Sequence, residues 1–176
     1  SDAWPGYYHA HRSAKSGQIV VVGAERTYAL QGFPARNRQS PLFNVGDKGY
    51  LLLADSNDTE PILDEPTRGR PKGIGYTRLE PPVWFDWIPI RVQGMVLAGD
   101  RLFVAGVPDE IDDSDPWAAF DGKKGALLRA YSAEDGRMLT EQTLDSPPVF
   151  DGLIAAAGRL LLCTTEGEVV CLGSTD

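Results

Sequence analysis

Two stretches of the chain decide its fold: residues 94–104 (GMVLAGDRLFV) and residues 152–162 (GLIAAAGRLLL). Every residue of the second stretch lies 58 positions after its counterpart in the first. Each stretch contains an apolar run of strand length that is introduced by a glycine-containing turn, which is typical of β-strands. The pair therefore predicts a protein built from repeated groups of strands.

The length of the repeat narrows the fold class. The first copy carries an acidic insert of 16 residues, 107–122, and subtracting it from the 58-residue spacing leaves 42. A four-stranded propeller blade has ~40–45 residues. A weaker third copy begins at 18–23 (QIVVVG) and continues at 27–30 (TYAL).

We therefore expect an all-β protein, a single partial β-propeller domain over residues 1–176 made of four-stranded antiparallel blades. The predicted blade-like units are listed here: 1–39, 40–88, 89–145 and 146–176. Strand-like apolar runs lie in these units at 19–22, 50–53, 102–104 and 160–162. Helix should be minor, because the nearest candidate, 117–120 (WAAF), lies between Pro116 and Gly122 and has room for one turn.

Composition and charge exclude several functions. The formal net charge of −8 would repel phosphate backbones and anionic membrane surfaces, so we expect no nucleic-acid partner. No run approaches the ~20 consecutive apolar residues of a membrane span, which predicts no membrane insertion. The start of the sequence, SDAWPG, lacks the build of a signal peptide.

A family resemblance rests on three stretches: 130–139 (AYSAEDGRML), 146–152 (SPPVFDG) and 167–172 (GEVVCL). They resemble the repeats of the pyrroloquinoline-quinone (PQQ), or quinoprotein alcohol dehydrogenase-like, β-propeller family. In that family an Asp-Gly turn ends one strand, a Ser-Pro-Pro-Val strand opens the next blade, and a Gly-x-hydrophobic strand closes a hairpin. The similarity covers residues 89–176 well and the first half loosely. The chain is also similar to C-terminal segments of large bacterial proteins that carry such repeats.

One position departs from the family pattern. The family repeat ends in a tryptophan four residues after the glycine, where it locks neighbouring blades together, and here that position is Thr140. The resemblance therefore implies degenerate, non-catalytic blades that act as a scaffold or binding module. Its implied partners are the remaining blades of a parent protein or a second copy of the chain, in an exported, periplasmic or cell-surface setting.

The alternative is part of a PQQ-dependent oxidoreductase. Quinone dehydrogenation needs an aspartate base, a calcium or lanthanide ion held by oxygen ligands, and a tryptophan stacked on the quinone. A closed ring of blades supplies that site in the family, so we assign no catalytic or cofactor-binding residue within this chain. PQQ would be a cofactor only if the parent protein is an enzyme.

The acidic insert is a candidate calcium loop. Asp109, Asp112, Asp113 and Asp115 offer closely spaced oxygen ligands of the kind that calcium prefers. The insert lacks the central glycine and terminal glutamate of a helix-loop-helix calcium site, so an acidic surface loop without metal is the alternative. Two weaker metal candidates are the 55–58 segment and the pair His9 and His11.

Three tryptophans are candidates for a binding surface: Trp84, Trp87 and Trp117. Amphipathic rings dominate many binding surfaces. The alternative is packing between blades, because strand alternation places Trp84 on one face and Phe85 with Trp87 on the other. We favour packing for the 84–87 segment.

The only two cysteines, Cys163 and Cys171, lie in one expected hairpin. With a two-residue turn at Glu166-Gly167, Cys163 would lie opposite Val170 and Cys171 would lie on the other face. Only a three-residue loop would align the two cysteines. We therefore expect free, buried thiols.

Overall fold

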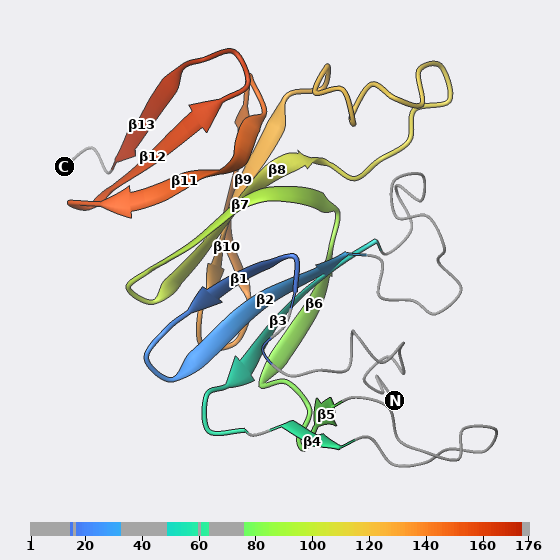
Figure 1. Cartoon of the computed structure of the whole chain (residues 1–176). Coiled ribbons are helices and arrows are strands. Elements are labelled where there is room, and N and C mark those ends of the chain that lie inside the picture. The colour runs from blue at the N-terminus through green and yellow to red at the C-terminus, as the bar shows by residue number, and fades with distance from the viewer. Residues whose placement is uncertain (1–14, 16, 33–48, 60, 64–75, 174–176) are drawn as a thin grey trace. The chain divides into compact units, whose positions relative to one another are not determined.

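The computed structural model describes residues 15, 17–32, 49–59, 61–63 and 76–173 (Figure 1). These residues form thirteen β-strands and no helix, which confirms the all-β prediction. No helix long and apolar enough to cross a membrane occurs in this part of the chain. The strands divide between two compact units, one holding the described residues up to Trp87 and the other those from Ile88 to Gly173.

The first unit contains a four-stranded antiparallel-paired sheet in the order β1-β2-β3-β6. Its strands are β1 (Ile19–Val22), β2 (Arg26–Gly32), β3 (Tyr50–Ser56) and β6 (Trp84–Ile88). The two central strands, β2 and β3, are buried along almost their whole length, as their apolar runs predict. A separate two-stranded pair joins β4 (Pro61–Leu63) to β5 (Tyr76–Arg78).

The second unit contains two antiparallel sheets in which consecutive strands are neighbours. The four-stranded sheet has the order β10-β9-β8-β7, and the three-stranded sheet has the order β11-β12-β13. The strands of the first sheet are β7 (Ile90–Ala98), β8 (Arg101–Pro108), β9 (Ala126–Ser132) and β10 (Met138–Leu144). Those of the second are β11 (Pro148–Ala156), β12 (Arg159–Thr164) and β13 (Val169–Gly173).

The two sheets of the second unit pack through their first strands, β7 and β11. At the closest approach, a Cβ added to Gly94 would lie 2.8 Å from the Cβ of Leu153. A shared apolar cluster fills the space beside these strands. Its buried members come from both sheets: Ala105, Ala126, Leu128, Leu144, Leu153, Leu160 and Leu162.

The strand registers confirm the 58-residue repeat. Met95 lies opposite Val104 in the β7–β8 hairpin, and Leu153 lies opposite Leu162 in the β11–β12 hairpin. Both residues of the second pair are 58 positions beyond those of the first, and the same holds at the turn-side pairs Ala98–Arg101 and Ala156–Arg159. The sequence repeat is therefore a repeat of hairpin geometry.

The acidic insert is one residue longer than the sequence comparison predicts. Leu128 of β9 lies opposite Ala105, and Val169 of β13 lies opposite Cys163, so the spacing falls to 41 residues after the insert. The segment itself connects β8 to β9. Within it, Asp121 N–H donates to Trp117 C=O at 2.8 Å, which closes the single helical turn expected there.

The turn between β11 and β12 contains a strained residue. Ala157 and Gly158 have φ values of 48° and 72°, as a type I′ turn requires at both central positions. An alanine in the left-handed region loses about 1 kcal/mol, because its Cβ crowds the following carbonyl, whereas asparagine tolerates this region.

We expect Ala157→Asn to raise the free energy of unfolding by about 1 kcal/mol, since Asn-Gly is the preferred type I′ dipeptide. Ala157→Val, which places a β-branched side chain at the same φ, should lower it. Thermal denaturation of both variants measures the difference. Equal shifts in melting temperature would contradict the assigned turn.

Candidate functional site

A hollow of about 730 Å³ lies between the two sheets of the second unit. The β7–β8 turn (98–101) and the β11–β12 turn (155–159) border it from the two sheets. Thr140 and Gln142 of β10 and the end of β13 complete its wall. The hollow lies where the two sheets diverge from the closely packed β7 and β11.

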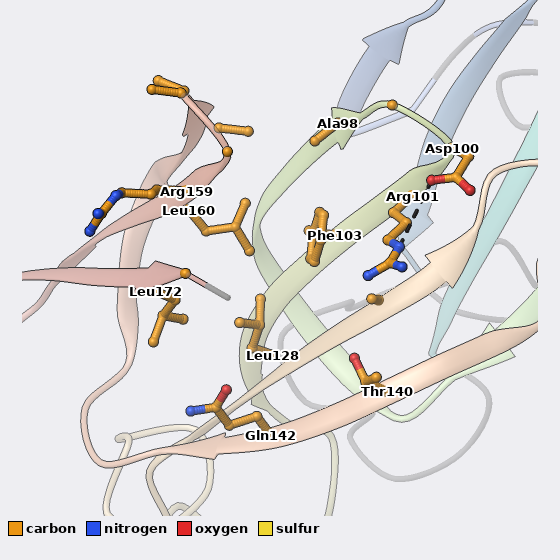
Figure 2. Close-up of a pocket in the computed structure, with 17 residues that line it drawn as sticks. Ala98, Asp100, Arg101, Phe103, Leu128, Thr140, Gln142, Arg159, Leu160 and Leu172 are labelled. Carbon is orange, nitrogen blue, oxygen red and sulfur yellow. Dashed lines mark ion pairs between the residues drawn. The ribbon is translucent and has the colours of Figure 1, made fainter. Parts of the chain in front are cut away.

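The floor of the hollow is apolar. Phe103 and Leu128 contribute from one sheet, and Leu160 and Leu172 contribute from the other. Figure 2 shows Leu160 pointing across the hollow toward Phe103. Alanine and glycine residues form much of the remaining wall, and their small size leaves the space unfilled. An apolar group could therefore bury surface here, at roughly 25 cal/mol per Å².

Two arginines occupy equivalent positions of the repeat at the rim, Arg101 and Arg159. Arg101 Nε lies 3.8 Å from an Asp100 carboxylate oxygen, a pairing between exposed side chains that contributes little to stability. The Arg159 guanidinium points away from Phe103 in Figure 2, and its Nη1 lies 3.8 Å from the Cys171 sulfur. The rim of the hollow thus carries charged groups of both signs around its apolar floor.

Thr140 lies on the wall of this hollow. The quinoprotein resemblance implies a large indole at the same position. A threonine has a much smaller side chain, so the space between the sheets remains open beside β10. The departure from the family pattern therefore coincides with the wall of this hollow.

Ion pairs organise the acidic insert. The Lys123 ammonium lies 2.7 Å from Asp115 and 3.6 Å from Asp121. The Lys124 ammonium lies 2.9 Å from Glu110 and 3.1 Å from Asp112. The two lysines that follow the insert thus pair with four of its carboxylates.

These pairs bear on the predicted calcium ligands. Asp109 is buried, and Asp112 and Asp115 face lysines, so the three do not form one ligand cluster. In the part of the chain that the structure describes, no three His, Cys, Asp or Glu side chains are grouped as a metal site requires. Calcium binding by Asp109, Asp112, Asp113 and Asp115 stays a prediction, and it would require Lys123 and Lys124 to be displaced.

Hydrogen bonds also set the acidity of the insert. The hydroxyl and backbone N–H of Ser114 donate to Asp112, and together with Lys124 they hold the pKa of this carboxyl well below its usual range. The pKa of Asp115 is lowered, first by its hydrogen bond from Lys123. These contacts favour the ionised carboxylates and so lower their pKa values. Their stabilisation of the folded protein is therefore fully present above pH ~4 and is lost as the pH falls through the lowered pKa of each carboxyl.

We expect Ser114→Ala to raise the pKa of Asp112, because it removes the hydroxyl hydrogen bond, the largest contact that lowers this pKa, while the backbone N–H of residue 114 remains. Lys124→Met should also raise it, because the ammonium contact is lost. An NMR titration of the side-chain carboxyl carbons measures both shifts, and an unchanged pKa in Ser114→Ala would contradict the assigned hydroxyl hydrogen bond.

An aromatic contact anchors the insert to β7. The Arg91 guanidinium carbon lies 4.2 Å from the centre of the Phe120 ring, a cation–π contact, and Phe120 meets Trp117 edge-to-face at 5.6 Å. Trp117 nevertheless remains 46% exposed. Its role as a binding residue stays a prediction that the exposed ring permits.

The other two candidate tryptophans lie in the first unit and serve packing. Trp84 is only 8% exposed, and its ring lies 6.0 Å from that of Tyr28. Trp87 and Phe85 are partly buried on the apolar cluster of Ala29, Leu51 and Leu53. The two faces of β6 are therefore divided as strand alternation predicts, and burial leaves little of the Trp84 ring for a ligand.

The cysteine prediction is wrong in two respects. Thr164 N–H donates to Glu168 C=O and Gly167 has φ 84°, so the β12–β13 loop has three residues rather than two. Cys163 therefore lies opposite Val169, and Cys171 is on the same face two positions further along. Both thiols are free, as expected, but they are exposed rather than buried.

The two weaker metal candidates of the sequence analysis gain no support from the structure. His9 and His11 lie outside the described residues. Asp55 is buried and accepts the Lys15 backbone N–H at 2.7 Å. Asn57 accepts a hydrogen bond from the Thr27 hydroxyl and donates to Gly23 C=O. The 55–58 segment thus ties local loops together.

Comparison with known proteins gives no assignment: no family model matches the chain, and no curated protein matches it. The resemblance to quinoprotein repeats therefore rests on the residues quoted for it. The hollow was not predicted from the sequence. Its one available signal was the 58-residue repeat, which places Arg101 and Arg159, and the turns that carry them, at equivalent positions.

Proposed function

We propose that this chain is a non-catalytic β-propeller repeat segment of quinoprotein type that acts as a scaffold or binding module of a larger bacterial protein. Two antiparallel sheets of repeating register, packed through their first strands, support this proposal. In a propeller, consecutive blades are related in this way.

The observation that carries the binding role is the hollow beside Thr140. Where the resemblance implies a locking indole, the chain leaves an apolar space of about 730 Å³, which falls in the range of small-ligand sites. The ligand would insert an apolar or aromatic group between Leu128 and Leu172.

Indole is a suitable probe of this site. We expect its addition to a labelled sample to shift amide signals at Leu128, Thr140 and Leu172. Thr140→Trp, which fills the hollow from its own wall, should abolish the shifts. Unchanged signals at the solubility limit of indole would contradict the binding role.

The proposed binding module also has expected protein partners, and the oxidoreductase function is the alternative to it. The remaining blades of a parent protein or a second copy of the chain would cover the sheets, and a second copy would give a dimer that salt does not dissociate. A native mass spectrum recorded with calcium and PQQ tests the oxidoreductase alternative. Added mass matching either on an intact monomer would favour that alternative over the non-catalytic module.

A further inference from the structure

Three aspartates of the chain are followed directly by glycine: Asp121-Gly122, Asp135-Gly136 and Asp151-Gly152. Such a dipeptide is prone to rearrange to isoaspartate without an enzyme, because glycine has no Cβ to shield the backbone nitrogen that must react. By sequence alone the three dipeptides are equally susceptible. Their surroundings in the folded chain differ, and the difference singles out the third.

The rearrangement passes through a five-membered ring. The backbone nitrogen of the glycine attacks Cγ of the protonated aspartate side chain, an N–Cγ bond forms, and the carboxyl hydroxyl leaves as water with the amide proton. Water then adds to one of the two ring carbonyls and reopens the ring. When the bond from the nitrogen to the main-chain carbonyl breaks, the chain continues through Cγ as isoaspartate. One water leaves and one enters, so no other reactant is needed.

The Asp135-Gly136 dipeptide is restrained at both reacting groups. The Gly136 N–H donates to Ser132 C=O at 2.9 Å. The Arg137 N–H donates to the Asp135 carboxylate at 3.1 Å. The side-chain hydrogen bond with Ser132 is the first cause that lowers the pKa of Asp135, so the protonated carboxyl that the reaction needs is rare. Ring closure therefore requires these contacts to break.

The Asp121-Gly122 dipeptide is restrained by the helical turn of the insert. The Gly122 N–H donates to Ala119 C=O at 3.1 Å. The Asp121 N–H donates to Trp117 C=O at 2.8 Å, so the backbone is held on both sides of the carboxyl. The Lys123 ammonium also lies 3.6 Å from this carboxylate. The nitrogen that would attack is thus already engaged.

The Asp151-Gly152 dipeptide lies in a bulge of β11. The β11–β12 pairing is interrupted between Pro148 and Leu153, so residues 149–152 have no partner in the ladder. Asp151 has φ 58°, a left-handed conformation that is unfavourable for residues other than glycine. Its side chain is exposed, and no hydrogen bond or ion pair joins it to another described residue. Within the described chain, neither ladder pairing nor a side-chain contact restrains the Asp151 carboxyl.

We propose that Asp151-Gly152 is a self-modification site, at which the folded chain rearranges to isoaspartate while the other two dipeptides stay intact. The site adjoins Leu153, whose Cβ would lie 2.8 Å from a Cβ added to Gly94. Isoaspartate adds one carbon to the backbone immediately before this close contact. The modification should therefore displace Leu153 from β7 and weaken the packing between the two sheets.

Peptide mapping of the folded, unmodified chain after incubation at mildly acidic pH and physiological temperature tests the proposal. Isoaspartate should accumulate at residue 151 about tenfold faster or more than at residue 135, because each hydrogen bond that must break slows the reaction by roughly fivefold. The same chain unfolded in guanidinium chloride is the control. There the three dipeptides should react at similar rates, because the contacts that distinguish them are lost.

Two variants assign the product to its site. Asp151→Glu keeps the charge but would have to form a six-membered ring, which closes far more slowly. It should therefore remove most of the isoaspartate that an isoaspartyl methyltransferase labels. Asp135→Glu, the matched control, should leave nearly all of the label in place. The modified chain, once separated from the unmodified one, should melt at a lower temperature because the packing at Leu153 is disturbed.

Equal rates at the three sites of the folded chain would overturn the proposal, as would a faster reaction at Asp121 or Asp135. A reaction at Asp151 that is fast only in the unfolded chain would overturn it as well, because the fold would then protect this site too. These rates come from the chain without substitution, so they decide the proposal even if Asp151→Glu does not fold. An unchanged melting temperature of the modified chain would refute its effect on the sheet contact.

Discussion

Replacing Leu162 with alanine should lower the free energy of unfolding of the second unit by about 3 kcal/mol or more. Leu162 is fully buried, at 0% exposure, in the cluster that both sheets share. Truncation removes its transfer free energy and leaves a cavity that neighbours from two sheets cannot easily fill. Urea denaturation, followed by NMR signals of the second unit, measures the loss.

The adjacent residue provides a matched control. Leu161 is on the same strand, but it points to the opposite face and is only partly buried. Leu161→Ala should therefore lower the free energy of unfolding by less than about 1 kcal/mol. Equal losses from the two variants would contradict the strand register, because a one-residue shift exchanges the two faces.

Local sequence patterns predicted the strands and their repetition. Apolar runs at 102–104 and 160–162 are inside β8 and β12, and the 58-residue spacing is preserved pair by pair. Strand propensity and turn residues act over a few positions, so a single sequence contains this information. The four strands expected per sheet are found in β7–β10 and in β1-β2-β3-β6, whereas the described residues of the β11–β13 sheet form three.

The β12–β13 loop shows where such reasoning ends. Thr165, Glu166 and Gly167 suit a two-residue or a three-residue loop, and the choice depends on Gly167 adopting a left-handed conformation. One residue of loop length exchanges the faces of β13. The error in the register of Cys171 follows from this single step.

The candidate site depended on tertiary structure. Ala130 and Ala155 border a hollow only because two sheets diverge at those positions. The carboxylates of the insert find lysines up to 14 residues away, at Lys124. No local sequence pattern predicts either the hollow or these ion pairs. Thr140, in contrast, was identified in the sequence, because the resemblance supplied an expected residue to compare with it.

The glycines of the repeat also show what the sequence predicts and what only the structure reveals. Gly94 and Gly152 are equivalent in sequence, and both are sterically required, but for different reasons. A Cβ on Gly152 would lie 2.5 Å from Val149 Cγ2 within its own strand, whereas one on Gly94 would meet the neighbouring sheet. The repeat predicted that both positions matter, and only the structure distinguishes their contacts.

Gly94→Val should lower the free energy of unfolding of the second unit by about 3 kcal/mol, the upper part of the range for overpacking. Its Cβ would lie 2.8 Å from the Leu153 Cβ, closer than carbon atoms approach without displacement. Neither atom is at the end of a flexible side chain, so one of the two strands must move. Urea denaturation of the variant, followed as for Leu162→Ala, measures the cost.

Gly173→Val is the control, since a Cβ there would meet only Arg159 Cγ at an ordinary 3.5 Å. A β-branched residue suits a strand better than glycine, so this variant should be neutral or more stable. Similar behaviour of the two variants would mean that β7 and β11 do not pack at close range. The proposed function depends on that contact, because it holds the two sheets together at their first strands and so creates the divergence that opens the hollow.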